Sequence, residues 1–256
     1  MTALPPIAPI PLSRVISVEL RKMFDTRSGF WLMASIAIAG ILATAAVIIF
    51  APDDELKYTT FATAIGFPMS IILPMVSVLS VTSEWSQRSG LTTFTLVPHR
   101  SRVVLAKAIA TIGVGVVSVL LALAIGVVGN LVGSALAGVD TTWDSNATEL
   151  ALIVLANVLG MLIGFMLGVL IRNSPGAIVG YFVFSLVLPT LAEVLAANTS
   201  WFKDTRPWVD FNYAQSALFN GDVTGEQWSQ LGVTSLIWLV APLTLGVWLM
   251  LRSEVK

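Results

Sequence analysis

The chain has 256 residues, of which 56% are hydrophobic and 11% are charged, and its net charge is −1 at pH 7. Soluble domains carry about 25% charged residues, so this composition excludes an ordinary soluble fold, and the near-zero charge gives no sign of nucleic-acid binding. With no Cys and a single His, the chain has almost nothing from which to build a disulfide, a metal site or a thiol nucleophile. It is expected to be an integral membrane protein.

Residues 1–11 hold four prolines and predict a disordered tail. Residues 12–28 then predict an amphipathic helix that lies along the inner membrane surface. Its apolar face is Leu12, Ile16, Leu20, Met23 and Phe24, and its polar face is Ser13, Ser17 and Arg21. The alternative is a cytoplasmic extension of the first membrane span.

Six apolar runs are long enough to cross a bilayer, which takes about 20 residues. They cover residues 30–50, 58–81, 103–131, 150–171, 176–197 and 231–251. Capping-box spacing precedes the fourth and sixth runs, at Asn146 with Glu149 and at Thr224 with Gln227. Ser174, followed by Pro175, is the predicted N-cap of the fifth run.

Lys and Arg collect on one side of these runs. Eleven of the 14 basic residues fall on the side of the two chain ends, and only Lys57, Lys203 and Arg206 fall on the other. Because cytoplasmic loops retain positive charge, both termini are predicted to be cytoplasmic.

The inner loop, residues 82–102, is the most informative polar stretch. It carries Glu84-Trp-Ser-Gln-Arg-Ser-Gly90 and, after a short apolar segment, Pro98-His-Arg-Ser-Arg102. Aromatic residues among polar ones can dock on a cytoplasmic partner, although a plain positively charged loop gives the same pattern.

Within the spans, glycines recur four residues apart, at Gly129 and Gly133 and at Gly160, Gly164 and Gly168. This spacing marks close helix contacts, within one chain or between two copies.

Candidate residues of a substrate path are Pro68, Pro74, Asn157 and Glu193. The prolines bend the second span, and Asn157 predicts an interhelical hydrogen bond or a substrate contact. Glu193 either reaches the outer headgroups or carries a proton or a cationic substrate.

The outer segment, residues 198–230, is too long for a structureless loop. Asp210 predicts the cap of a short helix that ends at Asn220-Gly221 and places Phe211, Ala214 and Leu218 on one face. The segment is read as short helices at the outer interface, either a gate or a passive lid.

Two stretches, taken in order, resemble the type-2 ABC exporter permeases. The first is Val18-Glu-Leu-Arg-Lys-Met-Phe-Asp-Thr-Arg-Ser28, and the second is Glu84-Trp-Ser-Gln-Arg-Ser-Gly-Leu91 followed by Pro98-His-Arg-Ser-Arg102 and Lys107. The six-span plan extends the resemblance over most of the chain. It implies an all-α permease domain over residues 12–256, with residues 12–28 as the elbow helix and residues 82–102 as the coupling loop.

The resemblance also implies partners: a separate ATP-binding cassette subunit, which binds ATP and Mg, and a second permease copy. The chain itself would bind no cofactor and have no catalytic residue, and it has no G-x-x-x-x-G-K-[ST] phosphate loop. The implied coupling residues are Glu84, Trp85, Gln87, Arg88 and Gly90, and the implied elbow-helix residues are Arg14, Glu19, Arg21 and Lys22.

The expected function is ATP-driven export of a lipophilic or amphipathic molecule, such as a drug, lipid or peptide, across a bacterial cell membrane. The alternative is a secondary transporter driven by an ion gradient, which would normally bury charges near the membrane centre. An intramembrane enzyme is the weakest candidate, because His99 lies in a loop and no triad partner can be assigned to it.

Overall fold

The computed structural model describes residues 10–25, 27–86 and 100–252, and within these ranges the chain forms helices and no strands. The α-helices are α1 (Leu12–Asp25), α2 (Arg27–Phe50), α3 (Tyr58–Ser86), α5 (Arg100–Ala137), α6 (Ala147–Ile171), α7 (Ser174–Phe182), α8 (Leu188–Asn198), α9 (Ser200–Val209), α10 (Phe211–Ser216), α11 (Gly225–Ser235) and α12 (Ala241–Arg252). Two π-helical segments, η2 (Val183–Val187) and η4 (Leu236–Val240), join α7 to α8 and α11 to α12. Short 3-10 turns form at η1 (Asp53–Glu55) and η3 (Ala217–Asn220).

Six helical stretches are long and apolar enough to cross a membrane, as the sequence predicts. They are Gly29–Phe50, Tyr58–Trp85, Ser101–Ala137, Ala147–Ile171, Ser174–Asn198 and Gly225–Arg252. The second and third extend further toward the inner loop than the apolar runs alone indicate. Residues 82–86 are the last turn of α3 and residues 100–102 the first turn of α5, and residues 87–99 of the predicted loop lie outside the described ranges.

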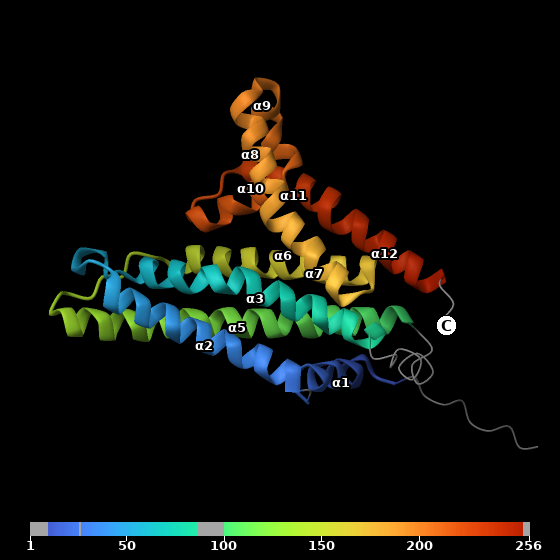
Figure 1. Cartoon of the computed structure of the whole chain (residues 1–256), viewed down its shortest axis with the longest axis horizontal. Coiled ribbons are helices and arrows are strands. Elements are labelled where there is room, and N and C mark those ends of the chain that lie inside the picture. Colours follow the sequence, from blue (N-terminus) through green and yellow to red (C-terminus); the bar gives the residue numbers. More distant parts are fainter. Residues whose placement is uncertain (1–9, 26, 87–99, 253–256) are drawn as a thin grey trace, which may run out of the picture.

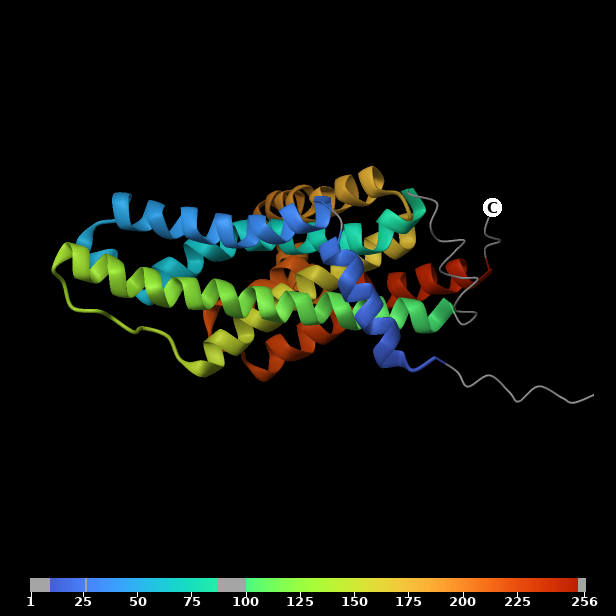
Figure 2. The same cartoon turned by 90° about the horizontal axis from the view of Figure 1, so that it is seen from below.

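Helix α3 is the centre of the bundle. It packs against α2, α5, α6 and α7, and Figure 1 shows α2, α3, α5 and α6 running side by side. The α7–α8 and α11–α12 arms lean away from these four helices, with α9 at the far end of the α8 arm. Seen from below, α1 crosses the ends of the long helices at a steep angle instead of extending the line of α2 (Figure 2). This direction favours the helix along the membrane surface over the straight extension.

Glycines on α6 let it approach α3 closely. A Cβ atom added at Gly164 would lie 2.6 Å from the carbonyl oxygen of Pro74, and one at Gly168 would lie 3.1 Å from Cβ of Val81. The glycine stripe of the fourth span therefore makes a contact within the chain, as does the pair Gly129 and Gly133, which packs against Phe61.

Three of the four predicted helix caps are confirmed, among them Asp210, which is described below with the outer segment. Asn146 with Glu149 and Thr224 with Gln227 both form complete capping boxes. The cap predicted at Ser174 is wrong, because the side chain of Asn173 accepts the hydrogen bond from Gly176 N. The hydroxyl of Ser174 instead donates to the Thr82 hydroxyl at 2.8 Å, so it joins α7 to the inner end of α3.

The outer segment folds as short helices, as predicted. Asp210 caps α10 by accepting from Tyr213 N, and the turn after η3 ends at Gly221, whose φ of 85° suits glycine. Phe211, Ala214 and Leu218 are all buried, and they pack in one core with residues of α6, α7 and α11. The segment is built on this shared core.

Replacing Gly164 by Ala tests the close approach of α6 to α3. The added methyl would meet the Pro74 backbone, which cannot move aside as a flexible side chain can. We therefore expect the free energy of unfolding in detergent to fall by about 1–3 kcal/mol. The control is Gly113→Ala on α5, where nothing lies within 4 Å of the added atom. Equal stability of the two variants would contradict this packing.

Candidate functional site

Four charged side chains from three helices meet at the predicted inner end of the bundle. Glu19 and Lys22 come from α1, Glu84 from the last turn of α3, and Lys107 from the second turn of α5. We call these four residues the inner charge cluster. Lys22 Nζ lies 2.8 Å from Glu19 and 2.7 Å from Glu84, while Lys107 Nζ pairs with Glu19 and lies 3.1 Å from Glu84.

The cluster is electrically balanced, and three of its members are buried, while the Lys22 side chain is 39% exposed. Glu19 is 3% exposed and Lys107 is 5% exposed, and Lys107 also donates to the carbonyl of Ser80. Two acids and two bases neutralise one another, so no net charge has to be desolvated. Removing one member would leave a buried charge without its partner, which typically costs about 3–5 kcal/mol. The cluster therefore holds α1, α3 and α5 together.

The same cluster raises the pKa of Lys22 above the ordinary value of 10.5. Partial burial by itself would lower this pKa, but hydrogen bonds and charge attraction from Glu19 and Glu84 favour the ammonium form more strongly. Because the pKa is higher in the folded state than in the unfolded state, Lys22 contributes stability that is fully present below pH 10.5. This contribution is lost as the pH rises through the folded pKa.

The inner turn between α6 and α7 reaches the same end of α3. Arg172, in the left-handed conformation with φ of 55°, ends α6 and places its guanidinium 5.6 Å from the Trp85 ring centre. This distance is within the range of a cation–π contact. Together with the hydrogen bond from Ser174 to Thr82, it ties the last turn of α3 to α6 and α7.

The predicted coupling and elbow residues thus fall into three groups. Glu84 lies in the inner charge cluster with Glu19 and Lys22, and Trp85 lies beside it. Arg14 and Arg21 are exposed on the opposite face of α1. Gln87, Arg88 and Gly90 lie outside the described residues, so their predicted role stays a prediction.

The residues proposed for a substrate path do not converge on one site. Pro68 and Pro74 lie inside α3, and Asn157 is buried on α6. The amide of Asn157 donates to Ile153 in its own helix at 2.8 Å, so the predicted interhelical bond is wrong. Glu193 is 71% exposed on α8, where it pairs with Arg206.

Pro74 nevertheless creates a specific contact. Proline has no N–H, so the carbonyl four residues earlier, at Ser70, loses its helical donor. The hydroxyl of Tyr181 on α7 donates to this carbonyl at 2.9 Å. This hydrogen bond joins the proline turn of α3 to the fifth span, and the backbone group that Pro74 frees is satisfied.

The outer segment is attached to both π-helical segments. Asn212 donates to the carbonyl of Phe184 in η2 at 3.1 Å, and the indole of Trp238 in η4 donates to the carbonyl of Val209 at 2.7 Å. The Phe184 ring lies 5.6 Å from that of Trp238. π-Helical turns recur at functional sites, and here both occur at the level where the outer segment is held.

Arg206 braces the outer segment. Its guanidinium lies 2.5 Å from Glu193 on α8 and 3.0 Å from Asp210 at the start of α10. Burial tends to lower its pKa, but the two carboxylates outweigh this effect and raise it, so Arg206 stays charged. Within the described ranges, no three His, Asp or Glu side chains gather closely enough to hold a metal ion.

Sequence reasoning missed that Glu19 and Lys107 are partners. A signal for each was present: Glu19 stands between Val15 and Met23 on the buried stripe of α1, and Lys107 interrupts an apolar run. A carboxylate on an apolar face and a lone cation inside a span both require a counter-charge. The sequence does not show that they require each other.

The fold and these contacts define a helical membrane protein with six candidate spans, an inner charge cluster and a braced outer segment. Comparison with known proteins adds no relative, since neither a protein family nor a characterised protein matches the sequence.

Replacing Glu19 by Gln tests the inner charge cluster. We expect a loss of about 3 kcal/mol or more in unfolding free energy in detergent, because Lys22 and Lys107 would then share the single carboxylate of Glu84 and the cluster would no longer be electrically balanced. The double variant Glu19→Gln with Lys107→Met should lose much less than the sum of the two single changes, because Lys22 and Glu84 remain a neutral pair. Arg14→Gln, on the exposed face of the same helix, is the control. Strictly additive losses would contradict the pairing.

The pH dependence of Lys22 is a separate test. The stability difference between the wild-type chain and Lys22→Gln should stay constant from neutral pH to near 10.5, the unfolded value, and shrink above it. Melting temperatures of both proteins from neutral pH to above 10.5, with Lys203→Gln as control, measure the effect. If the stability difference between the wild type and Lys22→Gln vanished already at neutral pH, Lys22 would not be stabilised by Glu19 and Glu84.

Proposed function

We propose that this chain is the membrane subunit of an ATP-driven exporter, working with a separate ATP-binding cassette subunit and a second copy of itself. The observation that carries the proposal is the inner charge cluster. It joins an amphipathic helix at the chain start to the end of α3, from which the polar inner loop departs. The sequence of that loop resembles the coupling segment of type-2 ABC permeases.

The arrangement supports force transfer from the inner loop. The last turn of α3 is tied to α1 and α5 through Glu84, and to α6 and α7 through Trp85 and Thr82. A partner that pulled on the loop would therefore move several spans together. Such joint movement is what an exporter needs if hydrolysis on a partner is to open a path through the membrane.

The outer segment supplies a gate at the opposite end. It rests on both π-helical segments and is braced by Arg206, so tilting the fifth or sixth span would change its contacts. The large lipophilic surface of the spans suits an amphipathic or lipophilic cargo. In this proposal, ATP and Mg bind to the partner subunit.

The test looks for an ATP-binding cassette subunit encoded beside this chain, as an exporter requires, and co-purifies that subunit with the chain in lipid nanodiscs. We expect stable co-purification and ATP turnover, and we expect Arg88→Ala in the inner loop to lower turnover severalfold. Lys203→Ala, which removes one charge at the opposite side of the spans, should leave turnover unchanged.

Two outcomes would contradict the proposal. If no ATPase co-purifies with the intact chain, the exporter assignment falls, and transport driven by an ion gradient becomes the function to test. If the subunit co-purifies but both variants behave like the wild type, coupling through the inner loop is wrong.

A further inference from the structure

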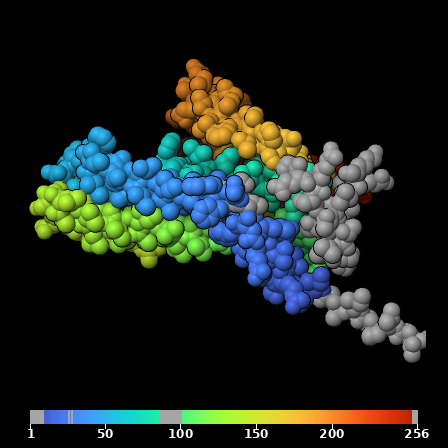
Figure 3. Space-filling view, turned by 60° about the horizontal axis from the view of Figure 1, so that its bottom comes forward, coloured from blue at the N-terminus to red at the C-terminus, as the bar shows by residue number. Residues whose placement is uncertain are grey.

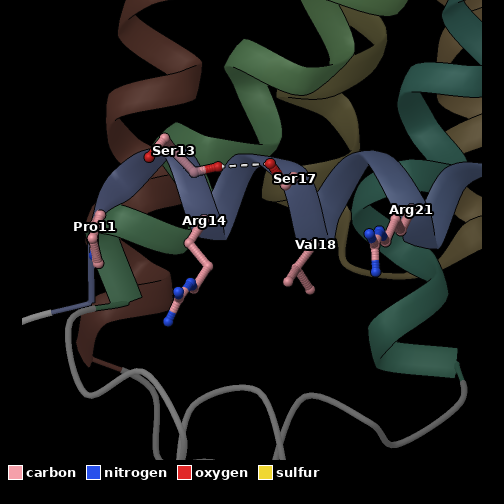
Figure 4. Close-up of a pocket in the computed structure, with 6 residues that line it drawn as sticks. All are labelled: Pro11, Ser13, Arg14, Ser17, Val18 and Arg21. Carbon is pink, nitrogen blue, oxygen red and sulfur yellow. Dashed lines mark hydrogen bonds between the residues drawn. The ribbon is translucent and has the colours of Figure 1, made fainter.

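The outward face of α1 carries a feature that the inner charge cluster does not use. Ser13, Arg14, Ser17, Val18 and Arg21 are all exposed on it, and with Pro11 they line an open hollow. Figure 4 shows Arg14, Val18 and Arg21 projecting from the same side of the helix. We call these residues the basic face of α1.

No ion pair among the described residues neutralises the basic face. Glu19, the carboxylate nearest in sequence, turns the other way into the inner charge cluster. Asp25 is exposed at the end of α1, and no ion pair among the described residues joins it to Arg21. The face therefore presents two guanidinium groups, seven residues or about 10 Å apart along the helix.

The same face is partly apolar. Val18, between the two arginines on this face, is 47% exposed, and Phe24, at the edge of the apolar face of the same helix, is 48% exposed. A surface turned only to cytosol gains nothing from keeping such side chains outside, whereas a helix at a bilayer surface inserts them between headgroups. Basic and apolar side chains together match an anionic membrane surface.

The position of α1 relative to nearby aromatic side chains fits the depth of the lipid headgroups. Phe30 and Trp31, near the start of α2, are both exposed and pack edge to face at 5.8 Å. Aromatic side chains concentrate at the boundary between headgroups and acyl chains, and α1 ends only a few residues before them. Figure 3 shows α1 on the outside of the bundle, where lipid can reach it.

We propose that the basic face of α1 binds the phosphates of anionic phospholipids in the inner leaflet. The guanidinium of Arg14 and that of Arg21 each take one phosphate, since Arg offers a fork of donors that matches phosphate oxygens. Val18 and Phe24 enter the boundary beneath the headgroups. Bound lipid fixes the depth of α1 and, through Glu19, the position of the inner charge cluster. The proposal goes beyond transport and does not depend on the ATPase partner.

Native mass spectrometry of the full chain tests this site. The detergent-purified protein is mixed with equimolar phosphatidylglycerol and phosphatidylcholine, and the bound lipids are counted. We expect the wild type to favour phosphatidylglycerol, and Arg14→Gln with Arg21→Gln to reduce this preference by about fivefold or more, because each basic residue near an anionic surface contributes about a fivefold effect. Neither arginine makes an ion pair among the described residues, so both proteins should share one melting temperature.

Two further variants make the result specific. Lys57→Gln with Lys203→Gln removes the same charge at the opposite side of the spans and should keep the preference. Arg14→Lys with Arg21→Lys keeps the charge but not the fork of donors, so it should keep only part of the preference. An unchanged lipid ratio in the glutamine variant would overturn the proposal. So would an unchanged ratio accompanied by loss of the co-purifying ATP-binding subunit, because the basic face would then contact protein and not lipid.

Discussion

A polar group at membrane depth must find its partner inside the protein, because hydrocarbon offers no water to replace a missing hydrogen bond. In this chain, two such partners come from helices distant along the sequence. Glu19 on α1 meets Lys107 on α5, and Tyr181 on α7 meets the carbonyl freed by Pro74 on α3. Apolar surfaces could pack in several ways in lipid, and these polar contacts select which helices are neighbours.

The polar contacts lie in two regions, joined by the packing of α3 on α6. At the inner end, α3 is fastened to α1, α5, α6 and α7, and at the outer end a set of short helices is held by the fifth and sixth spans. α3 carries Pro74 against the glycines of α6, and α6 in turn contacts the outer segment, where Gln215 donates to the carbonyl of Ala156. This continuity gives a physical route between the inner loop and the outer segment, which the proposed exporter would require.

Local sequence signals predicted local structure well. Asn146, Asp210 and Thr224 cap helices as expected, because a cap depends only on residues within one turn. The local signal failed at the start of α7, where two neighbouring residues can each cap the helix. Asn173 forms the cap, and Ser174 bonds across to Thr82. It also failed at Asn157, whose amide bonds within its own helix because the carbonyl of Ile153 lies within reach one turn away.

The sequence by itself determined that this is a six-span helical membrane protein with an amphipathic first helix and an ordered outer segment, because composition, run length and capping are properties of neighbouring residues. Only the tertiary structure decided that Glu19, Lys22, Glu84 and Lys107 form one cluster, that Tyr181 compensates Pro74, and that two π-helical segments hold the outer helices. A sequence shows that a buried charge or a freed carbonyl needs a partner. Which partner it finds depends on how helices distant along the chain pack in space.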